Sequence, residues 1–263
     1  PSPSYPNNLV MGTASYHEKT IFVKEWTDPP SSAINEIKTY RSLSNYLRGN
    51  IKLPKLLFAN RYMNKLEIGL EHVVGKTLNN YSQNKQLAIY HMVLSELSAI
   101  PVQQSKSIYI RPPIYIIFSF PYIFIKALLT YPIHRHDIFR SLSPFFKNIY
   151  HLLHAKLKFV HRDLGLENIM ISGKSIYLLD FQYASHSLPE YEYAGIWRSL
   201  SRDRRLSKQF LKQVIQNYCR PRSSMGRFKL LSMYYALLGL TDPNYSKSRV
   251  KDFLYVINET SKL

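Results

Sequence analysis

The sequence predicts an α+β protein of two lobes, a small β-rich N-lobe with one helix and a larger helical C-lobe. The first 75 residues hold short β-branched and aromatic runs separated by turn residues, with a single helical pattern among them. Most of the chain from residue 76 onward follows the 3.6-residue period of helices. With 263 residues and 45% hydrophobic composition, the chain can bury one large core or two smaller ones. We therefore expect lobes of residues 1–75 and 76–263.

The N-lobe elements follow in order along the chain. A strand is predicted over Lys19–Trp26 (KTIFVKEW), and the turn residues DPPSS end it. Helical spacing in SAINEIKTYRSLSNYL, with Ser32 as its cap, then predicts a helix whose first turns contain Glu36. Two further strands are predicted in PKLLFANRY and in KLEIGLEHVVG, which ends at Gly75. This order predicts a sheet accompanied by one helix.

The C-lobe is predicted to be helical except for one hairpin. Helices are expected in NKQLAIYHMVLSELSAI, over Asp137–Leu157, and in four segments after residue 191. The hairpin joins the runs NIMIS and SIYLLDF through a turn at Gly173. The most apolar stretch, Pro112–Ile125, contains prolines and is shorter than the ~20 residues that span a bilayer. A buried hairpin or helix is expected there, although the stretch also suits a surface resting on a membrane.

The net charge indicates the kind of binding partner, and the cysteine content indicates the compartment. A formal net charge of +18 favours anionic partners such as nucleotide phosphates, nucleic acid, acidic sugars or anionic lipid headgroups. The single cysteine, Cys219, excludes an intrachain disulfide and suits a reducing compartment. We expect a cytoplasmic protein, with peripheral membrane contact through residues 112–125 as an additional interpretation.

Three polar residues stand at the ends of the two C-lobe strands. In HRDLGLEN, Asp163 is followed five positions later by Asn168, and Asp180 ends the second apolar run. Carboxylate and amide oxygens are ligands that Mg²⁺ prefers, and magnesium at phosphoryl-transfer sites takes only one or two protein ligands. The hairpin would bring Asn168 and Asp180 together as metal ligands. Asp163 would then be left to accept a proton from an attacking hydroxyl.

These strings resemble the catalytic loop and metal-binding motif of the protein-kinase-like superfamily, H-R-D-x-x-x-x-N followed by D-F-G or a variant. The resemblance covers about residues 20–185 and implies ATP and Mg²⁺ as cofactors. It implies further that Lys24 contacts the nucleotide phosphates and that Glu36 pairs with Lys24. It also implies that the backbone near Glu71 to Val73 hydrogen-bonds adenine.

Two features place the resemblance closer to the aminoglycoside phosphotransferase and choline kinase branch. Glutamine replaces the glycine of D-F-G, and a helix is expected within roughly ten residues of Asp180. Little room remains for the long activation segment that protein kinases use as a peptide platform. The glycine-rich phosphate-covering loop is also not intact, because Gly12 stands alone before Lys24. Either the first strand is partly missing, or Asn7, Asn8 and residues 12–15 form a looser cover.

Other polar residues in and after the motif are expected to have mainly structural roles. His161 is expected to brace the catalytic loop without transferring protons. Arg162 is expected either to read a phosphate, as in many protein kinases, or simply to pair with a nearby carboxylate. Glu190, Glu192 and Asp203 are candidate acceptor contacts, but local charge balance against the many arginines is the expected role.

The leading interpretation is an ATP-dependent phosphotransferase that transfers the γ-phosphate to a hydroxyl of a small molecule, such as a sugar or a lipid-linked glycan. Nucleic acid is not the expected partner. Two alternatives stay open at this point. One is an atypical Ser/Thr protein kinase, favoured by the arginine of HRD and the basic C-lobe. The other is a catalytically weak kinase-fold module that binds anionic partners, favoured by the incomplete glycine-rich loop.

Overall fold

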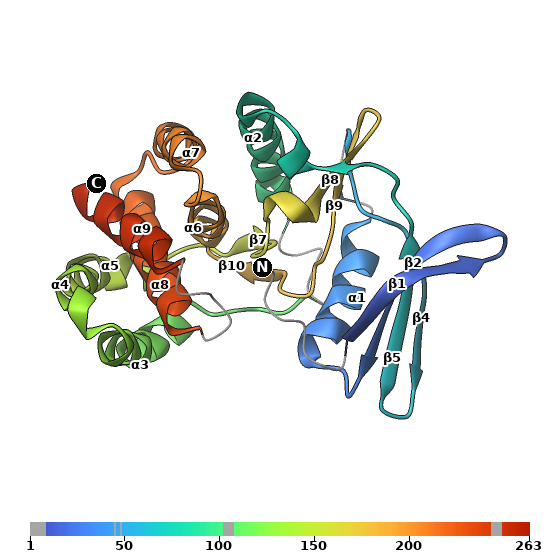
Figure 1. The fold of residues 1–263 in the computed structure, drawn as a ribbon, viewed down its shortest axis with the longest axis horizontal. Helices are drawn as coiled ribbons and strands as arrows, with labels where there is room; N and C mark the ends of the chain where they lie inside the picture. The colour runs from blue at the N-terminus through green and yellow to red at the C-terminus, as the bar shows by residue number, and fades with distance from the viewer. Residues whose placement is uncertain (1–8, 45, 48, 102–107, 243–248) are drawn as a thin grey trace. The chain divides into compact units, whose positions relative to one another are not determined.

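The computed structural model describes residues 9–44, 46–47, 49–101, 108–242 and 249–263. The chain divides into two compact units (Figure 1). The N-terminal unit comprises Pro1–Ile110 and Lys158–His186, and the C-terminal unit comprises Arg111–Leu157 and Ser187–Leu263. The bounds of these units differ from those of the expected lobes, 1–75 and 76–263. The division into those two lobes stays a prediction. The bounds differ because strands from both sides of residue 75 share one sheet.

The first sheet of the N-terminal unit has four antiparallel strands in the order β1-β2-β5-β4. Their bounds are β1 Leu9–Tyr16, β2 Lys19–Thr27, β4 Leu56–Tyr62 and β5 Lys65–Glu71. The β-branched and aromatic runs explain these strands, since such side chains pack well on a pleated surface. Gly69 of β5 allows close approach to β4, because a Cβ atom there would lie 2.3 Å from the ring of Phe58. The three strands predicted in this region are confirmed.

The segment before Lys24 forms strand β1, with Gly12 opposite Val23 and residues 13–15 paired with 20–22. β1 is an edge strand of its sheet, and Met11 and Thr13 line the pocket described below. A first strand is therefore present over Leu9–Tyr16, and a phosphate cover by residues 12–15 stays a prediction. The turn to β2 consists of His17 and Glu18, with φ of 46° and 62°. Asn7 and Asn8 lie outside the described residues.

The second sheet has the order β3-β9-β8-β6, with β3 parallel to β9. Its strands are β3 Ile51–Lys52, β6 Lys76–Thr77, β8 Ile169–Ser172 and β9 Ser175–Leu178. The predicted β8–β9 hairpin is confirmed. Ser172 pairs with Ser175, and Gly173 takes the positive φ of 58° that such a short turn requires. Strands β7 (Lys158–Val160) and β10 (Ser185–Ser187) form a separate two-stranded sheet.

Among its described residues, the N-terminal unit also has two α-helices and two short 3₁₀ helices. They are α1 Ser31–Leu43, η1 Leu78–Asn80, α2 Gln83–Ala99 and η4 Leu166–Asn168. The predicted serine cap of α1 is wrong. The helix begins at Ser31, two residues before the start that a cap at Ser32 implies, and Pro30 occupies the cap position without a side-chain hydrogen bond. Proline suits the start of a helix because its fixed φ is already helical and no donor is lost there.

The C-terminal unit is helical in its described residues, and α8 is its central element. The helices are α3 Ile114–Thr130, η3 Pro132–His134, α4 Arg135–Phe139, α5 Leu142–Leu153, α6 Pro189–Leu200, α7 Arg204–Asn217, α8 Arg222–Thr241 and α9 Val250–Lys262. Helices α3, α5, α6 and α9 all pack against α8. The core of the unit includes Trp197, Phe228 and Phe253.

The single helix expected over Asp137–Leu157 is instead two helices, α4 and α5, separated at Arg140 and Ser141. Pro144 explains the break, because it has no N–H to donate to the carbonyl of Arg140. The apolar stretch 112–125 lies largely in helix α3. Of the two expected alternatives, a hairpin and a helix, the structure has the helix. No single helix in the described part of the chain is long and apolar enough to cross a bilayer. Only the pair Ile114–Thr130 and Pro132–Phe139, bent by 111°, passes that test jointly.

Candidate active site

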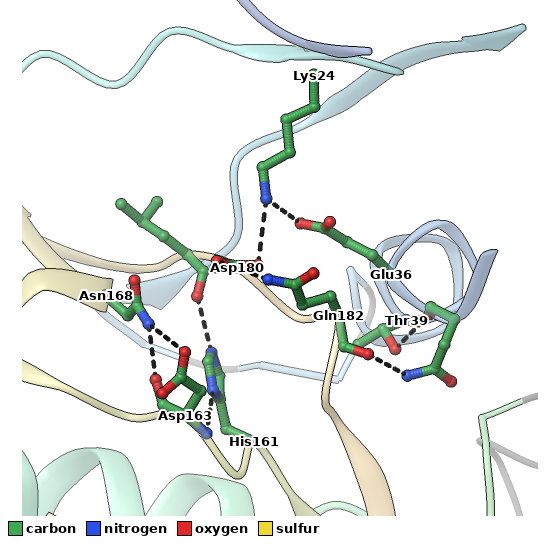
Figure 2. Close-up of polar contacts among 10 residues, drawn as sticks. Lys24, Glu36, Thr39, His161, Asp163, Asn168, Asp180 and Gln182 are labelled. Atoms are coloured by element: carbon green, nitrogen blue, oxygen red, sulfur yellow. Dashed lines mark hydrogen bonds and ion pairs between the residues drawn. The ribbon is translucent and has the colours of Figure 1, made fainter. Parts of the chain in front are cut away.

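The N-terminal unit buries a lysine between two carboxylates. Lys24 points from β2 toward α1, where its Nζ lies 2.8 Å from Oε1 of Glu36 (Figure 2). The same Nζ lies 3.2 Å from Oδ1 of Asp180. Lys24 is 4% exposed and Glu36 is fully buried. A buried charge is tolerated only when it is paired, so this arrangement depends on all three groups.

The charge state of Lys24 follows from its neighbours. Burial by itself lowers the pKa of the ammonium group, but the carboxylates of Glu36 and Asp180 outweigh it and raise the pKa above its ordinary value. Lys24 therefore stays positively charged at neutral pH. Such a fixed cation is suited to bind an anion that replaces one of its present partners, such as a phosphate oxygen.

The β8–β9 hairpin brings Asn168 next to Asp180, as the sequence predicted. The strand pairing runs from Ser172 and Ser175 to Ile169 and Leu178. It continues with a hydrogen bond of 2.9 Å from the Leu179 N–H to the Asn168 carbonyl. Asn168 and Asp180 line the same pocket.

Asp163 is joined to Asn168 by side-chain and backbone hydrogen bonds. The Nδ2 of Asn168 donates to the Asp163 carbonyl at 2.8 Å and to its Oδ2 at 3.2 Å. Figure 2 shows that the amide oxygen of Asn168 consequently lies on the side away from Asp163. The structure thus brings together the three residues that the sequence predicted as base and metal ligands.

His161 holds the catalytic loop against the strand that leads to Asp180. Its Nε2 donates to the carbonyl of Leu179 at 2.8 Å, and its Nδ1 accepts from the Asp163 N–H at 3.3 Å. A neutral imidazole satisfies both bonds, one as donor and one as acceptor. Burial lowers the pKa of His161 to about 4, which agrees with this neutral form. These contacts fit the bracing role expected for His161.

The buried imidazole makes stability depend on pH. In the unfolded chain His161 binds a proton near its ordinary pKa of 6.5, but in the folded protein it does so only near pH 4. The unfolded state therefore binds more protons between these values, and the free energy of unfolding must fall as the pH falls through this window. We expect His161 alone to account for a loss of about 2 kcal/mol between pH 8 and pH 5.

Urea unfolding of the wild type and of His161→Gln at pH 8 and pH 5 measures this loss. Glutamine can still donate to the Leu179 carbonyl but does not titrate. The variant should therefore lose about 2 kcal/mol less than the wild type over the same interval. An equal loss in both proteins would contradict a neutral, buried His161.

Two site residues adopt backbone conformations that non-glycine residues avoid. Arg162 has φ of 68° and Asp180 has φ of 60°. Such left-handed conformations cost of order 1 kcal/mol each for residues with a side chain. Arg162 directly precedes Asp163, and Asp180 is itself a predicted site residue. The surrounding structure therefore holds these two aspartates in place at a cost in stability. Arg162 donates from Nη1 to the Tyr183 carbonyl at 3.4 Å.

Sequence reasoning missed Asn35, which ties α1 to the segment after Asp180. Its Nδ2 donates to the carbonyls of Gln182 at 3.3 Å and Ala184 at 2.7 Å. Its Oδ1 accepts from the Tyr109 N–H at 3.1 Å. Asn35 is the neighbour of Glu36, so two consecutive residues of α1 are linked to the Asp180 segment, one directly and one through Lys24. Nothing in the local sequence marks this asparagine.

Tyr40 and Gln182 were also missed. Tyr40 lies one turn after Glu36 on α1 and lines the pocket that contains Asp180. Burial, and then the negative charges of Glu36 and Asp180, raise its pKa well above the ordinary value. Gln182, at the place of the motif glycine, donates from Nε2 to Oδ2 of Asp180 at 3.3 Å. The i, i+4 spacing from Glu36 is the one sequence signal that could have identified Tyr40.

The pocket beside these residues has a volume of about 370 Å³. Its apolar lining includes Phe22, Leu70, Met170 and Leu179. Its polar lining includes Lys24, Asn168 and Asp180. An apolar pocket with a few polar groups is typical of ligand sites, and here these groups combine a cation with oxygen ligands.

The predicted adenine-binding segment forms another part of the pocket wall. Glu71, His72 and Val73 all line the pocket. The N–H of Glu71 already donates to the Lys55 carbonyl at 2.9 Å, and its Oε2 accepts from the Lys55 N–H at 3.1 Å. The Glu71 N–H is therefore not a donor for a ligand. Val73 lies beyond the end of β5 and remains the predicted backbone donor.

The donor set fits a magnesium ion that is shared with phosphate. The described residues contain no group of three or more His, Cys, Asp and Glu that could hold a metal by itself. Asp180 offers a carboxylate, and Asn168 an amide oxygen without a hydrogen bond from the described residues. Magnesium often takes one or two protein ligands and completes its octahedron with water and phosphate oxygens. Asn168 and Asp180 are suited to that role.

The acidic residues considered as acceptor contacts have local partners. Glu190 is buried, and its Oε1 lies 2.7 Å from Nη2 of Arg227 and accepts from Oγ of Ser224 at 2.5 Å. Asp203 caps α7 by accepting from the N–H groups of Arg205 and Leu206, both at 3.0 Å. The ion pair of Glu190 with Arg227 agrees with the expected charge balance, whereas Asp203 acts as a helix cap. Glu192 is also buried.

Comparison with known proteins gives one family match. Residues 137–231 match the model of APH, the phosphotransferase enzyme family. This range contains Asp163, Asn168 and Asp180 but not Lys24 or Glu36. No curated protein sequence matches the chain.

The chain is similar to several solved structures. One is a thermostable mutant of aminoglycoside phosphotransferase APH(4)-Ia in ternary complex with AMP-PNP and hygromycin B, with a TM-score of 0.73 and 12% identity over 99% of this chain and 92% of that chain. The fold is that of the aminoglycoside phosphotransferases. Spectinomycin phosphotransferase APH(9)-Ia, in complex with ADP and spectinomycin, has a TM-score of 0.60 and 13% identity over 98% of this chain and 91% of that one. A choline/ethanolamine kinase family protein from Mesorhizobium loti has a TM-score of 0.61 and 15% identity over 99% of this chain and 90% of that chain.

These findings confirm the predicted α+β kinase-like fold and the predicted resemblance to the aminoglycoside phosphotransferase and choline kinase branch. The family match over residues 137–231 also confirms the predicted enzyme class, a phosphotransferase. The roles of the individual residues stay predictions, and the geometry above supports them.

Proposed function

We propose that this protein is an ATP-dependent phosphotransferase that transfers the γ-phosphate to a hydroxyl of a small molecule. One observation carries the proposal. Lys24 pairs with Glu36 and Asp180, and Asn168 donates to Asp163, all within a single compact unit. Lys24, Asn168 and Asp180 line one apolar pocket, and Asp163 is linked to that pocket through its hydrogen bond with Asn168. A scaffold protein would have no need for such a set.

Each residue has a distinct role in the proposed reaction. Lys24, oriented by Glu36, binds the nucleotide phosphates, and the backbone at Val73 binds the adenine. Asn168 and Asp180 hold Mg²⁺, which when bound neutralises the charge of the triphosphate. Asp163 aligns the acceptor hydroxyl and takes its proton. Positioning and electrostatic stabilisation contribute most of the rate in phosphoryl transfer.

The similar proteins support ATP and a small acceptor. The APH(4)-Ia structure holds AMP-PNP and hygromycin B, and the APH(9)-Ia structure holds ADP and spectinomycin. For the present chain we propose a hydroxylated small molecule of the sugar or lipid-linked glycan class. The reaction would take place in the cytoplasm, where ATP is available.

The distance from Asp180 to the next helix disfavours a protein kinase. α6 begins at Pro189, so only residues 181–188 separate the two. Asn35 fixes part of that short segment by bonding the carbonyls of Gln182 and Ala184. A peptide platform of the protein-kinase type would need a much longer segment here.

A thermal-shift experiment tests nucleotide use directly. ATP with Mg²⁺ is expected to raise the melting temperature, because a ligand at ~100 times its dissociation constant adds ~2.7 kcal/mol of stability. ATP with EDTA should give a clearly smaller rise. The variant Asp180→Asn should lose the magnesium-dependent part, since it removes one of the two proposed metal ligands.

Labelled ATP identifies the acceptor class. Incubation with a panel of hydroxylated metabolites should give labelled small molecules, with little label on the protein. Label that appears only on proteins would favour the protein kinase alternative. The binding-module alternative would gain if Mg²⁺ and ATP left the melting temperature unchanged.

A further inference from the structure

Helix α3 of the C-terminal unit is apolar on its exposed side as well as on its buried side. Its buried residues are Ile116, Phe120, Ile123 and Ala127. The opposite side carries Phe118, Tyr122, Ile125 and Leu129, which are between 56% and 78% exposed and follow a 4-3-4 spacing. Ile133 of η3, 91% exposed, follows beyond the end of α3. A soluble helix usually has charged or polar residues on such a side.

Helix α5 has the same property. Phe145 and Leu152 are buried, whereas Phe146, Tyr150 and Leu153 are exposed. The ring of Phe145 stacks on that of Phe120 with centroids 3.8 Å apart, so α5 and α3 lie side by side. Both helices pack on α8 (Figure 1).

The exposed residues of both helices therefore lie on the sides turned away from α8. The exposed apolar residues of these two adjacent helices and of η3 are here called the α3–α5 face, which consists of Phe118, Tyr122, Ile125, Leu129, Ile133, Phe146, Tyr150 and Leu153. An apolar surface of this extent usually marks an interaction site.

A basic groove borders this face on the α8 side of α5. The groove has a volume of about 760 Å³ and lies between α5, the first half of α8 and the end of α9. Its lining includes Arg140, Lys147, His151, Arg222 and Lys229. Lys147 and His151 alternate with Phe146 and Tyr150 along α5, so the groove and the α3–α5 face share this helix.

The positive charge of the groove is largely uncompensated. Arg140 has a partner, Asp137, at 3.4 Å. Lys147, Arg222 and Lys229 have no ion pair with any residue of the described chain. The pKa of Lys229 is lowered, first by burial and then by the positive charge of Lys147. Between residues 111 and 157 the sequence has six Lys and Arg residues and one acidic residue, Asp137.

We propose that the α3–α5 face and the basic groove together bind the surface of an anionic lipid membrane. The apolar side chains would enter the boundary between headgroups and acyl chains, and the groove would hold a lipid phosphate. Apolar burial and attraction to anionic lipids add together in such surface binding. Tyr122 and Tyr150 suit this position, because tyrosine has an apolar ring and a polar tip. The proposal does not depend on the phosphotransferase activity.

Charge complementarity distinguishes this occupant from a second copy of the chain. A copy of this protein carries the same net charge of +18, so it would place like charges against the groove. An anionic bilayer supplies both the negative charge and the apolar interior that the surface requires.

Co-sedimentation with vesicles tests the proposal on the full chain. The wild type should bind vesicles of phosphatidylcholine with phosphatidylserine much more strongly than phosphatidylcholine alone. The variant Lys147→Gln/Lys229→Gln should bind the anionic vesicles about 25-fold more weakly, from about fivefold per lost charge. The variant Phe118→Ser/Leu129→Ser should bind them roughly 100-fold more weakly, from about tenfold per side chain.

A matched control removes the same charge elsewhere in the unit. Lys208 and Lys212 are exposed on α7, which does not line the groove, so Lys208→Gln/Lys212→Gln should bind almost as the wild type does. All of the altered side chains lie on the surface, and unchanged melting temperatures would show that the variants fold.

Three results would overturn the proposal. The first is no binding to either kind of vesicle. The second is equal binding by the groove variant and the α7 control. The third is a concentration-dependent dimer in sedimentation that Phe118→Ser/Leu129→Ser disrupts, without vesicle binding, which would make the face a contact between copies. Inorganic phosphate tests whether the groove binds free phosphate instead of a lipid. If phosphate binds to the groove and vesicles do not, a lipid ligand is refuted.

Discussion

Asp163→Asn is expected to abolish phosphoryl transfer and to leave the fold and nucleotide binding intact. Asparagine has the shape of aspartate, and its amide oxygen can still accept the hydrogen bond that Asn168 now donates to Oδ2 at 3.2 Å. It cannot take the proton of an attacking hydroxyl. Losing a general base typically lowers the rate by roughly 10²–10⁴-fold. We expect kcat to fall in that range, with the shift of the melting temperature by ATP and Mg²⁺ unchanged.

The matched control for this substitution lies in the same loop. Glu167→Gln makes the same change from carboxylate to amide four residues later, at an exposed position. It should retain near-normal turnover, because the exposed Glu167 side chain makes no hydrogen bond or ion pair with Asp163, Asn168 or Asp180. If Asp163→Asn kept comparable activity, Asp163 would not be the base. If it lost the nucleotide-dependent shift as well, its role would lie in binding or folding.

Motif spacing was enough to predict which residues of the N-terminal unit meet. A two-residue turn at Gly173 fixes the register of the β8–β9 hairpin, and the register in turn places Asn168 beside the residue before Asp180. Lys24 and Glu36 were expected to pair because the family resemblance implied it, and the structure brings them to 2.8 Å. Local geometry together with a resemblance therefore accounts for the site.

Contacts between distant parts of the chain could not be predicted in this way. The parallel pairing of Ile51 with Ile176 joins segments far apart in the sequence, and no local pattern encodes it. This pairing is one reason why the compact units differ from the expected lobes. Asn35 is a similar case, since an asparagine on a helix has no periodicity that indicates its distant carbonyl partners.

The ends of helices and strands were predicted wrongly where several local conformations compete. Ser32 is a good cap by type, but the cap position of α1 is Pro30, two residues earlier. The sequence did not predict a full strand around the lone Gly12, yet residues 9–16 pair with residues 19–26 as β1 and β2. Here the pairing of neighbouring strands outweighed the preference of a single residue.

Lys24→Met is expected to have the largest effect on stability. Methionine would leave Glu36, which is fully buried, without the cation 2.8 Å from its Oε1, and Asp180 without its contact at 3.2 Å. Removing one partner of a buried ion pair typically costs about 3–5 kcal/mol, because the remaining charge is left uncompensated. We expect a loss of that size in urea unfolding at pH 7, together with loss of nucleotide binding.

A second substitution separates the two consequences. In Lys24→Met/Glu36→Gln the buried carboxylate is removed together with its cation, so most of the lost stability should return, whereas nucleotide binding should stay absent. Lys65→Met is the matched control, because Lys65 pairs with Glu25 at the same distance of 2.8 Å but on the exposed surface of the same sheet. Its effect should be small, since water screens an exposed pair. A double variant no more stable than Lys24→Met would show that burial of the Glu36 charge is not what makes the lysine necessary.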